Sequence, residues 1–118
     1  MLHLAHTARY HRSFVGAPLN FARGDWLISR VYAVLNEPRL ALQFAKSSLQ
    51  ITEKNNVSEH LPSAYEGMAR AYVITKENRL ARDYIKKARD ALKAAKIGAE
   101  DKKIYSDQID ETEALLKQ

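Results

Sequence analysis

The strongest constraint on the fold is an internal repeat, in which residues 30–46 recur as residues 70–86. The two segments align without a gap, and seven positions are identical: Arg30 with Arg70, Tyr32 with Tyr72, Glu37 with Glu77, Arg39 with Arg79, Leu40 with Leu80, Ala41 with Ala81, and Lys46 with Lys86. The two segments are 40 positions apart. Self-similarity with a period of this length is typical of proteins that stack one supersecondary unit. We therefore expect two copies of one packed unit, with equivalent side chains facing the same way.

The repeating unit is predicted to be helical. Apolar residues recur at helical spacing along nearly the whole chain, and no stretch alternates as a half-buried strand does. Breaker and capping residues divide this pattern into six helices. The predicted helices are 2–15, 18–35, 37–54, one that is capped by Ser58 with Pro62 in its first turn, 78–96 and 100–117.

The repeat resembles the tetratricopeptide repeat in the order of its small and large residues. The matching positions are Ser29, Tyr32, Ala41, Ala45 and Ser48 in the first copy, and Ala69, Tyr72, Ala81, Ile85 and Ala88 in the second. Small residues let antiparallel helices approach closely, while the larger ones fill the space between hairpins. The two copies are separated by more than the family's period of about 34 residues. The family's glycine beside the small position is also absent.

This resemblance implies an all-α fold in which antiparallel helical hairpins stack as an α-α superhelix. The chain would then be one TPR-like domain with an extra N-terminal helix (2–15), repeat 1 (about 18–54), repeat 2 (about 58–97) and a C-terminal capping helix (about 100–117). An ordinary α-helical bundle is the alternative, since short connections and amphipathic helices suit both folds.

A narrower resemblance covers most of the chain. Residue 20 and the segments 5–11, 15–16, 22–26, 29–35 and 99–103 look like a group of small bacterial tetratricopeptide-like proteins of unassigned function. No activity follows from this likeness.

Composition narrows the class of protein further. A chain of 118 residues that is 46% hydrophobic suits one domain, and the absence of cysteine excludes disulfides, thiolate nucleophiles and Cys-ligated zinc. The N-terminus does not read as a secretory signal, and no apolar run approaches the ~20 residues of a membrane span. We expect a cytoplasmic protein that does not associate with a membrane. The formal net charge of +5 favours acidic partners.

The resemblance also implies where a ligand would bind, because the first helix of each hairpin lines a concave groove. The groove positions are Arg23, Trp26, Arg30 and Ala33 in the first copy, and Ser63, Glu66, Arg70 and Val73 in the second, with Tyr72 as an apolar contact. Two neighbouring guanidinium groups can bind a carboxylate or phosphate. Alternatively, each arginine pairs with a nearby acid such as Glu66, Trp26 packs between helices, and Tyr72 is structural.

A row of cations on the fifth predicted helix suggests a second class of function. Arg82, Lys86, Arg89, Lys93 and Lys96 recur at spacings of three and four residues, which places them on one face. Such a stripe could follow the phosphate backbone of a nucleic acid. The alternative is a solvated outer face that is balanced by nearby acids, because no aromatic residues interleave the cations for base stacking.

Catalysis has little support in the sequence. His3, His6 and His11 lie close together, but their spacing is not that of a helical zinc protease, and His60 is distant. No phosphate loop, nucleophile elbow or paired-carboxylate motif is present. We therefore expect a non-enzymatic scaffold without a cofactor or metal, which binds a protein or peptide and forms a homodimer through helix 2–15. A nucleic-acid binder and a metal-dependent enzyme that uses the N-terminal histidines are the alternatives.

Overall fold

The computed structural model describes residues 18–116, which form five α-helices and no strand. The helices are α2 (Pro18–Val34), α3 (Pro38–Lys54), α4 (Leu61–Ile74), α5 (Asn78–Ala94) and α6 (Ala99–Leu115). The predicted all-α class is confirmed for this part of the chain. The predicted helix 2–15 lies outside the described residues.

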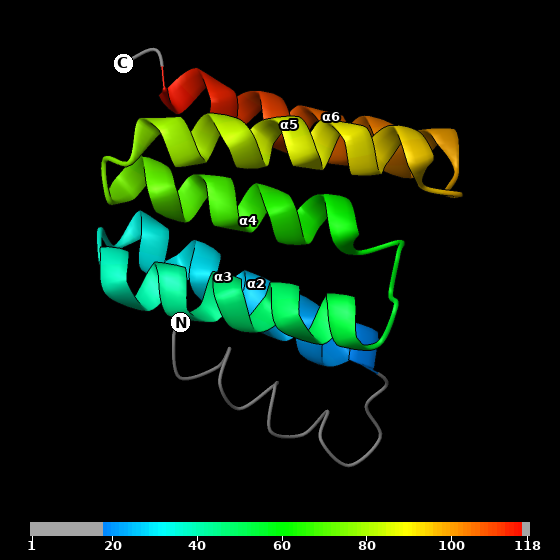
Figure 1. The fold of residues 1–118 in the computed structure, drawn as a ribbon, viewed down its shortest axis with the longest axis horizontal. Helices are drawn as coiled ribbons and strands as arrows, with labels where there is room; N and C mark the ends of the chain where they lie inside the picture. Colours follow the sequence, from blue (N-terminus) through cyan, green and yellow to red (C-terminus); the bar gives the residue numbers. More distant parts are fainter. Residues whose placement is uncertain (1–17, 117–118) are drawn as a thin grey trace.

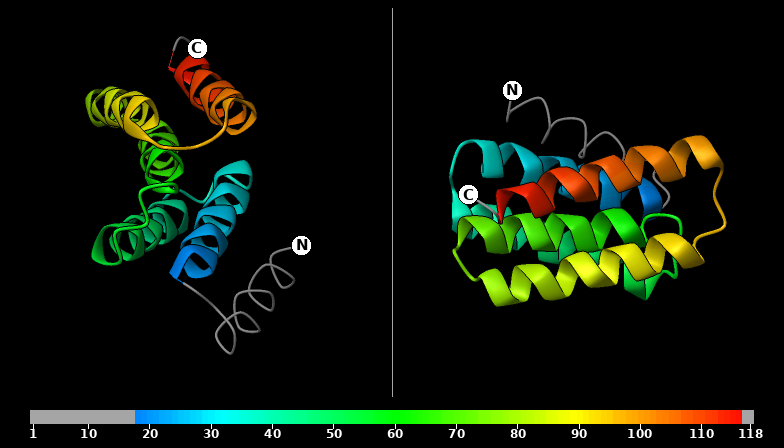
Figure 2. Two further views of the ribbon diagram at one scale, coloured as in Figure 1. Left: turned by 90° about the vertical axis from the view of Figure 1, so that its right-hand side faces the viewer. Right: turned by 90° about the horizontal axis from the view of Figure 1, so that it is seen from above.

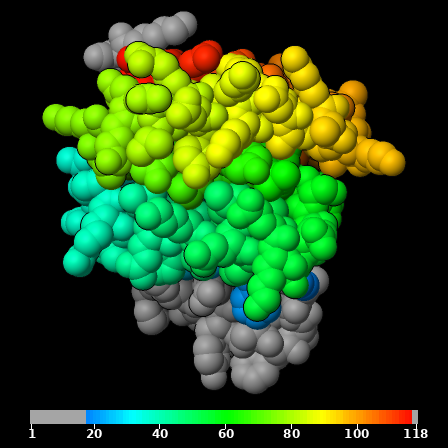
Figure 3. All heavy atoms as spheres, in the orientation of Figure 1, coloured from blue at the N-terminus to red at the C-terminus, as the bar shows by residue number. Residues whose placement is uncertain are grey.

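Helix α4 is the centre of the arrangement, because it contacts all four other helices. Helices α2 and α3 form one antiparallel hairpin and α4 and α5 form the next, while α6 packs against α4 and α5 (Figure 1). Viewed along the helices, α2 and α6 lie on one side of α4, and α3 and α5 lie on the other (Figure 2, left). In Figure 3, α3 and α5 accordingly dominate the face that is turned to the viewer.

Equivalent turns close the two hairpins with the same hydrogen bonds. The Glu37 amide donates to the Tyr32 carbonyl at 2.9 Å, and in the second hairpin the Glu77 amide donates to the Tyr72 carbonyl at 2.9 Å. The residues before the two glutamates, Asn36 and Lys76, have positive φ angles of 57° and 65°. This is the Schellman arrangement that ends many helices. The sequence repeat is therefore also a repeat of backbone conformation.

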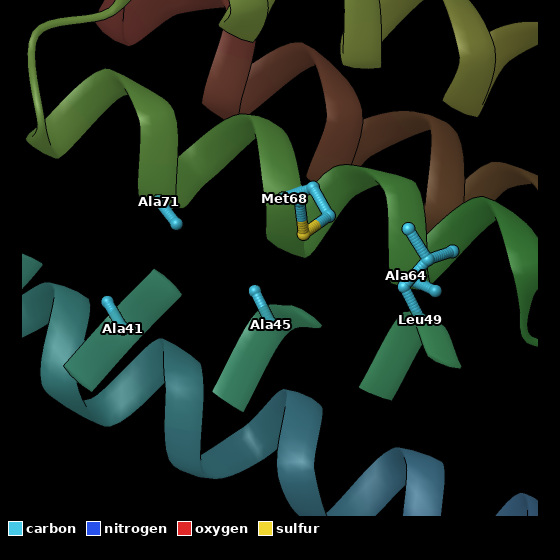
Figure 4. Packing of buried hydrophobic residues seen from close by; sticks show 6 residues of the cluster. All are labelled: Ala41, Ala45, Leu49, Ala64, Met68 and Ala71. Carbon is cyan, nitrogen blue, oxygen red and sulfur yellow. The ribbon is translucent and has the colours of Figure 1, made fainter. Parts of the chain in front are cut away.

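Small residues fill the contact between the two hairpins. Ala41, Ala45 and Leu49 of α3 face Ala64, Met68 and Ala71 of α4 (Figure 4). The equivalent residues Ala41 and Ala81 are both fully buried. Because alanine adds little bulk, the helix axes approach closely at these positions. A second cluster, made of Ala69, Ile85, Ala88, Leu92 and Ile109, joins α6 to α4 and α5.

Two equivalent aromatic pairs stack between the two helices of each hairpin. Tyr32 stacks on Phe44 with ring centroids 5.7 Å apart, and Tyr72 stacks on Tyr84 at 5.6 Å. Burial, followed by the nearby Tyr84, raises the pKa of Tyr72. Each pair joins the first helix of a hairpin to the second, so these side chains help to set the spacing of the helices.

Two details of the predicted helix boundaries need correction. Ser58 does not cap α4, since residues 57–60 form a turn and His60 is the N-cap residue. Pro62 explains this start, because proline lacks an amide hydrogen and is tolerated only in the first helical turn. Helix α5 ends at Ala94 rather than at residue 96. None of the described helices has the length and apolar character that crossing a membrane requires.

The turn at Lys76 provides a test of the repeated hairpin. A non-glycine residue with positive φ is strained, so replacing Lys76 with glycine should stabilise the fold by about 1 kcal/mol. Asn36→Gly is the matched control, and it should stabilise the fold less, because asparagine tolerates the left-handed conformation better. The midpoints of urea unfolding of the two variants and the wild type measure the two changes in stability. A lower midpoint for Lys76→Gly would show that residue 76 does not adopt the left-handed conformation.

Candidate functional site: the groove between α2 and α6

Helices α2 and α6 lie on the same side of α4 (Figure 2, left), and we call the space between them the groove and the two rows of residues that flank it its walls. The rows are Arg23, Leu27, Arg30 and Val34 on α2, and Ile104, Gln108, Glu111 and Leu115 on α6. Each α6 residue follows its α2 counterpart by 81 positions, and within each row the spacing places all four residues on one helical face. Arg30 Nη2 lies 3.7 Å from Glu111 Oε2, so the two rows are joined by an ion pair at this point.

Most of the exposed large hydrophobic residues of the described chain lie in the two walls. In the described part of the chain, six large hydrophobic residues are exposed, and four of them lie in the two rows: Leu27, Val34, Ile104 and Leu115. The most exposed is Val34 at 78%. A scattered exposed leucine needs no explanation, but apolar residues gathered along one groove are typical of an interaction site.

One end of the groove deepens into a hollow of about 240 Å³. Three helices and the turn before α4 line this hollow, through Arg23, Trp26, Leu27, His60, Ser63, Tyr105 and Gln108. Its volume is below the range of about 300–1,000 Å³ that drug-sized ligands occupy. The hollow can hold a single side chain of a larger partner, beside the rings of Trp26 and Tyr105.

A buried carboxylate forms the floor between the walls. Glu66 is 1% exposed, and its Oε1 accepts a hydrogen bond of 3.1 Å from Nε1 of Trp26. Its Oε2 accepts from Arg70 Nε at 2.9 Å and from the Thr112 hydroxyl at 2.7 Å. Arg70 Nη2 in turn donates to the Thr112 hydroxyl at 3.1 Å. This network joins α2, α4 and α6 through one side chain.

The network decides which of the predicted groove residues are available to a ligand. Arg70 is committed to Glu66 and Thr112, which is the internal pairing that the sequence left open as an alternative. Arg30 lies over the Trp26 ring at 5.6 Å and pairs with Glu111. Its Nη1 is buried, and no described residue accepts a hydrogen bond from it. Arg23 is exposed and forms no ion pair with a described residue.

Trp26 and Tyr72 differ in their surroundings. The indole of Trp26 lies close to Gly67, where an added Cβ would come within 3.0 Å of Trp26 Cδ1. Glycine at this position therefore lets the ring rest against α4 while it borders the hollow. Tyr72 lies on the other side of α4, against Tyr84, and takes no part in the network around Glu66.

The predicted basic stripe is divided by an internal ion pair. Arg89 Nη2 donates to Asp110 Oδ1 at 2.9 Å and to Glu113 Oε1 at 3.0 Å, so Arg89 fastens α5 to α6. The hydrogen bond from Arg89 to Asp110 is the main reason why the pKa of Arg89 is raised. The other four cations, Arg82, Lys86, Lys93 and Lys96, are exposed. A nucleic-acid backbone that followed the stripe would meet the two carboxylates at its centre.

Histidine does not gather with acids into a metal site in the described residues. No group of three His, Asp or Glu side chains that could hold a metal ion occurs between residues 18 and 116. His3, His6 and His11 lie outside the described residues. His60 is 2% exposed, and its Nε2 lies 3.3 Å from the Ser48 hydroxyl. Burial and then the positive charge of Arg23 lower the pKa of His60 to about 4.

Sequence reasoning missed the contribution of α6 to the site. Tyr105, Gln108, Glu111 and Thr112 all belong to the helix that was predicted to be a cap. Helices α2 and α6 begin 81 positions apart, which is not twice the 40-residue spacing of the two copies. The alignment of residues 30–46 with residues 70–86 therefore gave no signal for α6.

The chain matches no protein-family model, and comparisons with curated proteins and with solved structures give no significant match. The tetratricopeptide resemblance therefore stays a prediction, and the function has to be argued from the groove itself.

The low pKa of His60 predicts a pH dependence of stability. Between pH 6.5 and 4 the unfolded chain binds a proton that the folded protein excludes, so the folded state loses stability as the pH falls through this range. From pH 7 to pH 5 the loss should be about 2 kcal/mol, which urea unfolding at the two pH values measures. His60→Gln should remove most of this difference. If His60→Gln retains the full pH dependence, His60 is not its source.

Proposed function

We propose that this chain is a protein–protein interaction module that holds a peptide or protein segment in the groove between α2 and α6. The observation that supports this most is the pair of matched walls, which leave apolar residues exposed above a floor of satisfied polar groups. A ligand that covered Leu27, Val34, Ile104 and Leu115 would remove their apolar surface from water, which is the main favourable term in protein association.

The scaffold of this module is proposed to be TPR-like. Three repeated features support the proposal: the hairpin turns at Asn36 and Lys76, the fully buried alanines at positions 41 and 81, and the stacked aromatic pairs. In such a stack, equivalent helices line one surface, and each repeat contacts only its neighbours. Helix α6 then takes the place of the first helix of a further hairpin.

The charges on the α2 wall indicate the chemistry of the segment. Arg23 is exposed and lacks an ionic partner among the described residues, and Arg30 has a buried Nη1 without an acceptor among them. Acidic groups on the segment can pair with the exposed Arg23 and with the exposed part of the Arg30 side chain, and Arg–carboxylate hydrogen bonds are among the stronger ones. The bound segment is therefore proposed to be acidic along its α2 side, with an apolar side chain in the hollow beside Trp26.

A display library of random peptides tests this proposal. Wild-type protein should select sequences that combine acidic and large apolar residues, and Arg23→Glu with Leu27→Glu should weaken binding of a selected peptide at least tenfold. Trp26 is the only tryptophan, so its fluorescence reports binding at the groove. Wild-type protein should show a saturable change in emission when the peptide binds.

Arg82→Glu with Lys86→Glu is the matched control, since both residues are exposed on α5, away from the groove. This pair should change the affinity by less than about twofold at physiological salt. Equal losses for the two pairs of substitutions would show that net charge, and not the groove, governs binding. Failure of the wild-type protein to select any sequence would contradict the proposal directly.

Two other predicted partners, a second copy of the chain and a nucleic acid, gain no support from the described residues. A homodimer through helix 2–15 rests on a segment that the structure does not describe. A nucleic-acid partner is disfavoured by the neutralised Arg89 at the centre of the basic stripe.

A further inference from the structure

A second hollow, of about 440 Å³, lies between the C-terminal half of α5 and the N-terminal half of α6. Its lining is Arg89, Leu92, Lys93, Lys102, Lys103 and Ser106. Four of these six residues are cationic and none is acidic, although α6 as a whole carries many carboxylates. Two different helices supply the cations, so the cluster is a product of the fold and is not apparent in either helix alone.

Two of the four cations lack an ionic partner in the described part of the chain. Arg89 is held by Asp110 and Glu113, and Lys103 Nζ lies 3.3 Å from Asp107 Oδ2. Lys93 and Lys102 form no ion pair with any residue between 18 and 116. Lys102 is also half-buried, so its charge is less screened by water than that of an ordinary surface lysine. The two unpaired ammonium groups of Lys93 and Lys102 line one concavity, which is unfavourable in the free protein.

The rest of the lining suits an anion that is small and multivalent. The Ser106 hydroxyl is a hydrogen-bond donor, and Leu92 provides an apolar surface. The volume falls within the range that small ligands occupy. Lysine ammonium groups bind phosphate as compact point charges and can approach it from several directions. Arg89, fixed by its two carboxylates, gives the hollow a rigid edge.

We propose that this hollow binds a small, multivalent phosphate anion, with Lys93 and Lys102 as its principal ligands. A nucleic-acid chain is the less suitable occupant, because no aromatic residue lines the hollow for base stacking. The site lies on the α5 side of α6 and is separate from the groove between α2 and α6.

Titration calorimetry of the full chain with inorganic triphosphate tests the proposal. Wild-type protein should bind one triphosphate, with an affinity that falls as salt is added. Lys93→Gln with Lys102→Gln should weaken binding at least tenfold. The control pair, Arg82→Gln with Lys86→Gln, also removes two positive charges, but from a part of α5 outside the hollow. It should weaken binding less than about twofold. Backbone amide shifts should concentrate at residues 89–93 and 102–106 in the wild-type protein.

A nucleoside triphosphate and a single-stranded oligonucleotide complete the experiment. Tighter binding of the nucleotide than of triphosphate would mean that the base adds contacts, and equal binding would mean that the phosphates alone are recognised; both results support the site. The proposal is overturned if wild-type protein does not bind triphosphate, or if both pairs of substitutions weaken it equally. It is also overturned if the oligonucleotide binds far more tightly and depends on Arg82 and Lys86 as well. Circular dichroism of each variant verifies that the helices are intact.

Discussion

The buried carboxylate of Glu66 is the interaction on which the proposed groove depends. Its two oxygens accept hydrogen bonds from Trp26 on α2, from Arg70 on its own helix and from Thr112 on α6. A carboxylate that is 1% exposed is costly unless it is paired and fully hydrogen-bonded, so all three partners have to be in place. The same requirement holds the two walls of the groove at a fixed position over α4.

This network is a consequence of the repeat. Trp26 and Glu66 are equivalent positions in successive hairpins, and stacking places equivalent side chains side by side. Had both copies kept the same residue, these two side chains could not have formed a donor–acceptor pair. Divergence at one repeat position thus produces a specific contact between neighbours. The small residues at the hairpin contacts could not diverge in this way, since they set how closely the helices approach.

The fold was largely predictable from sequence, and the site only partly so. The internal repeat identified the hairpins, since Ala41 and Ala81 must be buried in equivalent places, and the predicted helix 37–54 agrees with α3 to within one residue. The start of α4 was wrong because a serine that could cap a helix precedes the proline that determines the first turn. Among the predicted groove residues, spacing alone could not tell Arg70, which is bound internally, from Arg23, which is exposed. The pairing of Arg70 with Glu66 was an open alternative in the sequence, but its second partner, Thr112 of α6, lies 42 positions away in the chain and was not predicted.

A double-mutant cycle between Trp26 and Thr112 tests this account most directly. The two residues are joined through their hydrogen bonds to Glu66, so Trp26→Phe and Thr112→Val each remove one bond from the same carboxylate. If the carboxylate joins α2 to α6, the effects on the free energy of unfolding should be non-additive by about 0.5 kcal/mol or more. Strictly additive effects would show that the two walls are not coupled through Glu66, and the groove would lose its physical basis.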